Sequence, residues 1–230
     1  MIHAFGSPHP PVPRLVAALA ARGHTLARGA GDAPGERSTL VLGPGIVPNP
    51  MAIATLLGAW RKTPGARVLV VSLVGCHRDA VAPRLRDLWD LEEEARRSGL
   101  PTLTLRLAPL LGPESPLWLR LRSRPRVKHA GRVMIQPLAE EDAVETLDRA
   151  LKGAVTWRDW YELAGPEVLS LAELIERAAA AGPALPGGVG AWEPPIEEMR
   201  EHRIAEIEPW SSRFGVTPRP VGERMAAWCA

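Results

Sequence analysis

The sequence predicts an α/β fold, a shortened doubly wound parallel sheet with a small C-terminal α+β appendage. The apolar run Arg67 to Val74 is typical of a strand in the middle of a parallel sheet. Apolar segments alternate with amphipathic helical segments along most of the chain, which favours parallel strands joined by helices. A chain of 230 residues with 46% hydrophobic residues is long enough for one sizeable core.

The N-terminal elements follow from apolar periodicity and from the glycines and prolines that end them. The expected strands are Ile2 to Phe5, Gly23 to Arg28, Thr39 to Leu42, Arg67 to Val74 and Thr102 to Leu107. The expected helices are Val12 to Arg22, Met51 to Arg61 and Pro83 to Ser98. Gly23 and Gly99 suit the end of a helix, and Pro64-Gly65 breaks the second one.

The C-terminal part is richer in proline and glycine, and its elements are shorter. Its expected strands are Val133 to Gln136 and Trp157 to Leu163, and its expected helices are Glu140 to Leu151, Ser170 to Ala181 and a piece near Ile196 to Ile207. Ser170 and Glu173 have the spacing of a capping box. We therefore expect a Rossmann-like domain over residues 1–155, reduced between its second and third strands, and a small appendage packed on it over residues 156–230.

Composition excludes several classes of protein. The formal net charge of +2 does not demand nucleic acid or an anionic membrane as partner. The two cysteines, Cys76 and Cys229, lie far apart in the sequence, which fits a reducing compartment better than a disulfide framework. Neither a signal peptide nor a transmembrane stretch is visible, so we expect a cytoplasmic protein or one peripheral on a membrane complex.

Three segments in order resemble a known family. They are Glu92 to Arg106, Gln136 to Ala143 and Tyr161 to Leu174. Together they resemble atypical and extended short-chain dehydrogenases/reductases, in the NAD(P)-binding, epimerase-like branch that includes the dehydrogenase-like accessory subunit of respiratory complex I. The resemblance implies a Rossmann fold, an NAD(P) site after the first strand and a catalytic Tyr-x-x-x-Lys pair.

The first turn departs from the family's T-G-x-x-G-x-x-G motif. Gly6 keeps the first glycine position, whereas His9 and Val12 occupy the other two. The surrounding prolines, Pro8, Pro10, Pro11 and Pro13, remove backbone N–H groups that would cradle a phosphate. One interpretation is a remodelled loop with His9 as a new nucleotide contact. We favour the other, a vacant turn with Gly6, Ser7 and His9 as vestiges and no cofactor.

The catalytic pair is also missing. The resemblance puts the tyrosine at Arg84 and the lysine at Leu88, and neither residue type is present there. Ser72 matches the family's serine at the end of the central strand. His77 and Asp79 follow closely, so the three are weak candidates for an improvised acid/base site.

The adenine side of the fold is shortened. Only a short loop joins the second strand to the third, where the family places a helix and another strand. This removes a wall of the adenine pocket and exposes an edge strand near residues 24–28. Arg28 lies where an NADP-preferring member would hold the 2′-phosphate, and we interpret it as solvated.

A basic run gives the best candidate contact surface. It follows Leu117 and comprises Trp118, Arg120, Arg122, Arg124, Arg126 and Lys128. It would suit an acidic partner or an anionic surface, although a solvated loop explains it as well. The histidines and cysteines show no metal-ligand spacing.

The losses of phosphate loop, catalytic pair and adenine wall lead to one main hypothesis. We expect a non-catalytic relative of these dehydrogenases, a pseudoenzyme that serves as an accessory, assembly or structural subunit of a larger protein complex. The alternative is an NAD(P)-dependent oxidoreductase or epimerase with a divergent nucleotide loop, in which case NAD(P) would be the cofactor. No specific nucleic-acid partner is expected.

Overall fold

The computed structural model describes residues 1–5, 11–27, 35–44, 50–185 and 199–229. These residues divide into two compact units. Unit 1 comprises Met1–Arg106 and Leu147–Tyr161, and unit 2 comprises Leu107–Thr146 and Glu162–Ala230. The division differs from the expected boundary near residue 155, because residues 107–146 pack with the C-terminal part of the chain.

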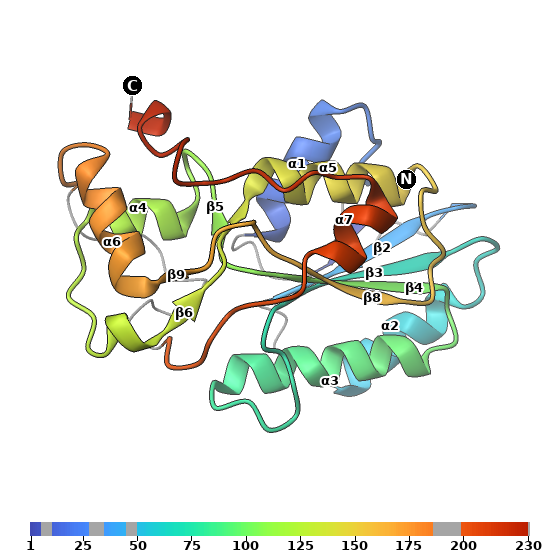
Figure 1. Cartoon of the computed structure of the whole chain (residues 1–230). Coiled ribbons are helices and arrows are strands. Elements are labelled where there is room, and N and C mark those ends of the chain that lie inside the picture. The colour runs from blue at the N-terminus through green and yellow to red at the C-terminus, as the bar shows by residue number, and fades with distance from the viewer. Residues whose placement is uncertain (6–10, 28–34, 45–49, 186–198, 230) are drawn as a thin grey trace. The chain divides into compact units, whose positions relative to one another are not determined.

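A five-stranded sheet in the order β1-β2-β3-β4-β8 forms the centre of unit 1 (Figure 1). Its strands are β1 (Ile2–Phe5), β2 (Thr39–Leu42), β3 (Arg67–Leu73), β4 (Thr102–Leu107) and β8 (Trp160–Leu163). The first three strands are parallel, with Ile2 opposite Thr39 and Thr39 opposite Arg67 at the first rung. The predicted parallel α/β architecture is therefore confirmed, and the apolar run of β3 lies inside the sheet as expected.

Helices cover both faces of this sheet. Figure 1 shows α1 (Val12–Ala21) on one face, and α2 (Pro50–Trp60) and α3 (Pro83–Arg97) on the other. Leucines of α3 and apolar residues of α2 form one core with β2 and β3. α5 (Glu140–Leu151) begins in unit 2 and ends in unit 1.

The expected second strand is reduced to one bridge. Leu26 pairs with Ile2 in a parallel bridge, held by the hydrogen bonds from Ile2 N to Thr25 O and from Ala27 N to Ile2 O, both 2.8 Å. His24 does not join the sheet; its ring binds the carboxylate of Asp148 at 2.7 Å instead. Among the described residues, the outer edge of β1 is therefore paired with another backbone segment only at Ile2.

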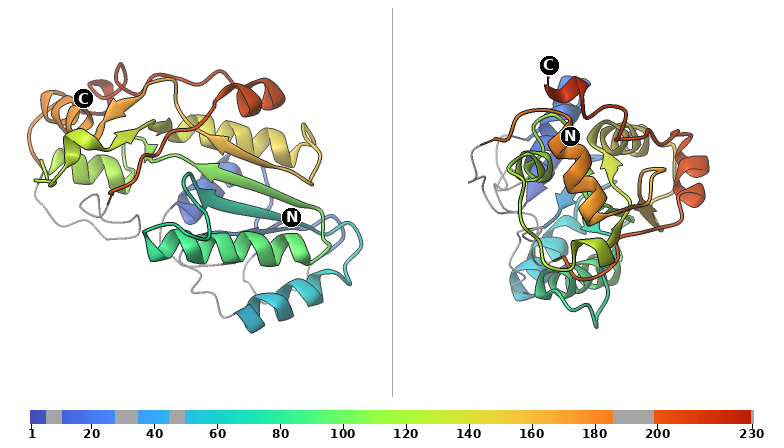
Figure 2. Two further views of the ribbon diagram at one scale, coloured as in Figure 1. Left: turned by 60° about the horizontal axis from the view of Figure 1, so that its bottom comes forward. Right: turned by 60° about the vertical axis from the view of Figure 1, so that its left-hand side comes forward.

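Unit 2 has a hydrophobic core of its own. Figure 2 shows the ribbon of the chain in two further views. Its helices are α4 (Pro116–Arg122), α6 (Leu171–Ala180) and α7 (Glu208–Phe214), with short 3-10 turns at Ala130–Arg132 and Ala227–Cys229. β5 (Leu110–Leu111) pairs with β7 (Leu138–Ala139), and β6 (Met134–Ile135) pairs with β9 (Leu169–Ser170). The capping box of Ser170 and Glu173 is confirmed at the start of α6.

The helical piece expected near Ile196 to Ile207 is wrong for the residues that the structure describes there, 199–207. Arg203 instead forms a bridge with Ile135, and Ala205 N donates to Gln136 Oε1 at 2.9 Å. These contacts hold the segment extended, and the next helix begins only at Glu208. Residues 196–198 lie outside the described part. No helix within the described ranges has the length and apolarity needed to cross a membrane.

Candidate functional site

The carboxyl ends of β1, β2 and β3 meet at one edge of the sheet. The last rung pairs Phe5 with Leu42 and Leu42 with Val70. Ligands of open parallel α/β sheets bind outside this edge, where loops and helix N-termini converge. The predicted loop residues Gly6, Ser7, Pro8, His9 and Pro10 lie outside the described residues, and so does Arg28, which we interpreted as solvated.

The start of α1 is the described element closest in sequence to that loop. Pro11 is its N-cap residue, none of the described side chains caps the helix, and no acidic residue lies in its first turn. Pro13 removes one backbone N–H, but Val12 and Arg14 each keep theirs. An uncapped N-terminus with a positive dipole end and a nearby arginine favours an anion over a cation.

Val12 occupies the position of the third motif glycine, and the structure shows how the fold accommodates it. A Cβ atom on Gly43 would lie 2.3 Å from the Cγ2 atom of Val12. The glycine that permits close packing between α1 and the sheet therefore sits on the strand side, just after β2. Val12 is buried, so its side chain fills this contact. The loss of that glycine from the motif is thus no sign of a collapsed site.

The two positions of the missing catalytic pair differ in environment. Arg84 is exposed on the first turn of α3. Leu88 is buried to 4% exposure in the core that α3 forms with β3. Leu88 has therefore become a packing residue.

Ser72 ends up inside the protein. Its side chain is fully buried near the carboxyl end of β3, beside the Cys76 thiol, and its hydroxyl makes no regular hydrogen bond with the described residues. Burial, together with the nearby Glu92 carboxylate, raises the pKa of Cys76 to about 12. Cys76 is thus a protonated thiol at neutral pH and not a nucleophile.

His77 and Asp79 lie in the connection from β3 to α3, on the carboxyl side of the sheet. Both are exposed, and Asp79 N donates to His77 Nδ1 at 3.2 Å. Arg78 Nε binds the Asp79 carboxylate at 3.0 Å. The structure therefore places His77 and Asp79 in an exposed connection at the edge where a ligand is expected, whereas Ser72 lies buried within β3. Among the three, imidazole is the side chain that most often serves as a general acid or base.

The predicted contact strip is not one continuous surface. Trp118 is 1% exposed and belongs to the core of unit 2. Arg122 is also buried, and its guanidinium donates to Pro183 O at 2.7 Å. Sequence periodicity did not reveal α4, which turns these two side chains inward. The accessible members of the strip are Arg120, Arg124, Arg126 and Lys128.

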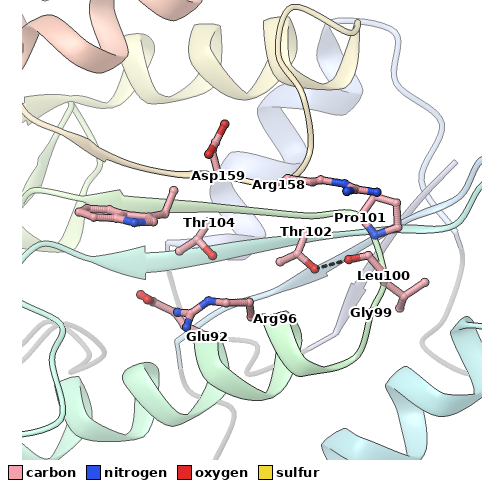
Figure 3. A pocket seen from close by; sticks show the side chains of 10 residues that line it. Glu92, Arg96, Gly99, Leu100, Pro101, Thr102, Thr104, Arg158 and Asp159 are labelled. Atoms are coloured by element: carbon pink, nitrogen blue, oxygen red, sulfur yellow. Dashed lines mark hydrogen bonds between the residues drawn. The ribbon is translucent and has the colours of Figure 1, made fainter.

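A cavity of about 350 Å³ lies away from the carboxyl edge, at the start of β4 (Figure 3). Glu92 and Arg96 of α3, Thr102 and Thr104 of β4 and the segment from Arg158 to Trp160 line it. Its deepest charge, Glu92, is already paired with Arg106 at 2.7 Å, and Arg96 pairs with Glu93. Within the described part of the chain, no three His, Cys, Asp or Glu side chains are grouped to hold a metal ion.

No family model and no curated protein matches this chain. Solved structures do match it in fold. MoeE5 in complex with UDP-glucuronic acid and NAD is 18% identical, with 99% of this chain and 98% of that chain covered and a TM-score of 0.71. RMD from Pseudomonas aeruginosa complexed with NADPH is 15% identical, covers 99% and 96%, and has a TM-score of 0.67. UDP-glucose 4-epimerase from Thermotoga maritima with UDP-glucose is 13% identical, covers 98% and 96%, and has a TM-score of 0.68.

These comparisons correct one expectation. The expectation that no cofactor is associated with this chain is contradicted, because MoeE5 and RMD share its fold from end to end and hold NAD and NADPH. We expected a vacant turn because its prolines remove backbone N–H groups and because His9 and Val12 stand at motif glycine positions. The contact of Val12 with Gly43 shows that the sheet side makes room for the second of these residues. The chain has the Rossmann-like α/β fold that is found in NAD(P)-binding dehydrogenase- and epimerase-like enzymes.

Proposed function

We propose that this protein binds NAD(P) at the carboxyl edge of its sheet and acts as an oxidoreductase or epimerase with a divergent nucleotide loop. The observation that carries the proposal is the uncapped N-terminus of α1, which follows β1 in a fold whose similar structures hold NAD or NADPH. UDP-glucuronic acid and UDP-glucose are named in those structures, so a nucleotide sugar is the substrate to test first.

The described residues fit a dinucleotide. The N–H groups of Val12 and Arg14 and the dipole of α1 suit a pyrophosphate. Gly43 has no side chain and accepts Val12, so α1 packs on the sheet despite the changed motif. NAD(P) would supply the hydride acceptor or donor of the reaction.

Proton transfer must come from residues other than the usual pair, because Arg84 and Leu88 replace it. His77 is our candidate for the general acid or base. The backbone N–H of Asp79 donates to its Nδ1 atom, which fixes the neutral ring with its proton on Nε2. Nδ1 must leave this contact before the ring can take up a second proton and donate one from Nε2.

Titration of NADH and NADPH by fluorescence tests cofactor binding directly. We expect micromolar binding in the protein as it stands, and an Arg14→Glu variant that binds about tenfold more weakly because a carboxylate replaces a cation near the phosphates. Arg61→Glu, an exposed change at the end of α2, is the matched control. No binding at millimolar NADH would refute the proposal.

Turnover is the second arm of the test. With UDP-glucose and NAD, activity should fall on the order of a hundredfold or more in His77→Ala while cofactor binding stays unchanged. Equal turnover in His77→Ala and the unchanged protein would remove His77 from the mechanism.

One observation favours a second candidate function, a non-catalytic accessory subunit that keeps its cofactor. The buried Leu88 replaces the lysine of the catalytic pair. This candidate predicts NADH binding without turnover of any nucleotide sugar, together with a protein partner recovered by pull-down through Arg120, Arg124, Arg126 and Lys128. A role in respiratory complex I or at a membrane surface stays a prediction.

A further inference from the structure

The amino edge of the same sheet carries a second cavity, of about 440 Å³, within unit 1. Its floor is the first rung of the sheet, where Ile2, Thr39 and Arg67 lie side by side on β1, β2 and β3. The end of α5, from Leu151 to Gly153, forms another wall. This cavity lies at the opposite ends of the strands from the proposed cofactor site, so no residue of α1 contributes to it.

The lining of this cavity is cationic. Arg37, Arg67, Lys152 and His24 contribute to it, and none of the described aspartates or glutamates does. The nearby Asp148 carboxylate is bound by His24 Nε2 at 2.7 Å and by Lys152 Nζ at 2.9 Å. Asp148 thus balances part of this charge, whereas Arg37 and Arg67 form no ion pair with a carboxylate of the described residues.

Arg67 is the central group. Its guanidinium stacks on the ring of Trp157 at 3.9 Å, and it donates from Nε to Thr39 Oγ1 and from Nη2 to Leu151 O, both at 2.9 Å. Both acceptors are uncharged, and no carboxylate in the described part of the chain pairs with Arg67. Burial lowers its pKa with no compensating charge.

A half-buried cation without a paired carboxylate is unfavourable, since desolvation penalises the charge and an aromatic ring and neutral acceptors repay only part of that cost. Arginine has five N–H donors in a rigid fork, and two of them are used here. The remaining donors are held in place by the ring of Trp157 and the two hydrogen bonds. An anion with several acceptor oxygens would satisfy both the charge and the donors.

Arg37 is held at the mouth of the cavity by an unusual backbone. Its φ angle is 57°, in the left-handed region that favours glycine, and its N–H donates to Pro64 O at 3.3 Å. Gly65, which lies close to Arg37 in space, also has a positive φ, of 71°. A Cβ atom on Gly65 would lie 3.3 Å from Arg37 Cγ. A strained non-glycine residue that places a charged side chain on a cavity is common at ligand sites.

We propose that this cavity binds a small molecule that carries a phosphate group. Arg67 supplies the fixed fork and Arg37 an exposed positive charge beside it, while Lys152 reaches the same cavity from its ion pair with Asp148. The cavity volume of about 440 Å³ is in the range of sites that bind small molecules, and it is larger than the volume of a phosphate ion alone. The cavity at the start of β4 does not call for an anion in the same way, because its charged side chains Glu92 and Arg96 already form ion pairs with other residues.

Calorimetric titration of the full chain with glucose 1-phosphate and with inorganic phosphate tests the proposal. The double variant Arg37→Gln/Lys152→Gln removes two exposed cations of the cavity, and Arg61→Gln/Lys62→Gln removes two exposed cations elsewhere in unit 1. We expect dissociation constants on the order of 1 mM or lower, at least about a tenfold weakening in the first double variant, and less than about twofold in the control.

Two further variants keep the result interpretable. Arg67→Lys keeps a positive charge but loses the planar fork, so it should weaken binding about tenfold while circular dichroism shows an unchanged fold. Arg14→Glu, at the opposite edge, should weaken NADH binding and leave glucose 1-phosphate binding unchanged.

Absence of binding of glucose 1-phosphate at a concentration of about 10 mM would overturn the proposal, because a still weaker affinity would have little use. Equal affinity of the two double variants would do the same, as would loss of binding in Arg14→Glu, which would place the phosphate at α1. Because the variants act at opposite edges, failure of this site leaves the proposed NAD(P) site standing, and the converse also holds.

Discussion

Arg106 binds the buried carboxylate of Glu92 through two hydrogen bonds, from Nη2 to Oε2 at 2.7 Å and from Nε to Oε1 at 3.1 Å. The pair joins α3 to β4 inside unit 1, and Glu92 is 2% exposed. The guanidinium also lies 4.5 Å from the ring centre of Trp160. The first of the three segments that carry the family resemblance begins at Glu92 and ends at Arg106, so its two ends meet in space.

Breaking this pair from one side should destabilise the protein strongly. Glu92→Leu leaves the Arg106 guanidinium buried without this carboxylate, which costs about 3 to 5 kcal/mol of unfolding free energy. The double variant Glu92→Leu/Arg106→Leu should cost less than the single one, because both charges leave the interior. Urea denaturation measures the free energy of unfolding of the single and of the double variant. Glu94→Leu, which removes an exposed partner of Arg97, is the control and should cost under about 1 kcal/mol.

The match between Val12 and Gly43 predicts a coupled effect on stability. Gly43→Ala should cost about 1 to 3 kcal/mol, since its methyl group would overlap Val12. Adding Val12→Ala should recover part of that loss, which a double-mutant cycle in urea detects. Gly58→Ala on the exposed side of α2 has open space and should stabilise the helix by up to about 1 kcal/mol. Strict additivity of the two core changes would contradict the contact.

The two thiols should differ in reactivity. Cys76 is buried, with a pKa raised to about 12, whereas Cys229 is partly exposed. One thiol should therefore react with a disulfide reagent in the native protein at pH 8, and Cys229→Ser should abolish that reaction. Cys76 should react only after denaturation. Two equally fast thiols would contradict the burial of Cys76.

Cys76 also predicts a pH dependence of stability. Its ordinary pKa is 9.0, and burial raises the folded value to about 12. The folded state therefore holds the thiol proton to higher pH than the unfolded state does. The resulting stabilisation is complete below pH 9 and is lost as the pH rises from 9 to 12. Unfolding free energies across this range should fall less steeply in Cys76→Ala.

The C-terminal segment of unit 2 is tied to α5 through Arg219. Its guanidinium lies 3.0 Å from Glu141, 3.2 Å from Asp142 and 2.8 Å from Glu145. Arg219→Ala should cost about 1 to 2 kcal/mol, after allowing for the partial exposure of the arginine. Limited proteolysis after residue 215 should become faster. Arg213→Ala, an exposed change on α7, should leave the cleavage rate unchanged. In 1 M salt, the difference in cleavage rate between Arg219→Ala and the unchanged protein should become smaller.

Much of the fold could be predicted from local patterns. The apolar run of β3 and the capping box of α6 are strong signals because strand burial and helix capping depend on residues close in sequence. α4 was missed because Leu119 and Leu121 alternate with Arg120 and Arg122, as in a strand. Ser115 followed by Pro116 was the available cue, and Ser115 Oγ does accept the N–H of Trp118.

The candidate sites could be predicted only in part. The position of a ligand edge after β1 follows from strand-turn-helix order. The compensation between Val12 and Gly43 does not, because it depends on which residues face each other across α1 and β2. The same holds for Arg67, which looks in the sequence like any arginine before a strand. Its missing counter-ion is visible only when Thr39, Leu151 and Trp157 surround it.

The burial of Leu88 has a consequence for redesign of this protein. A lysine introduced at this position would have to place its ammonium group inside the core of α3, so the variant would lose stability before it gained any activity. A tyrosine introduced at the exposed Arg84 would lack that partner. Adding a Tyr-x-x-x-Lys pair by single substitutions is therefore unfavourable, and the exposed connection that carries His77 is the better place to add catalytic groups.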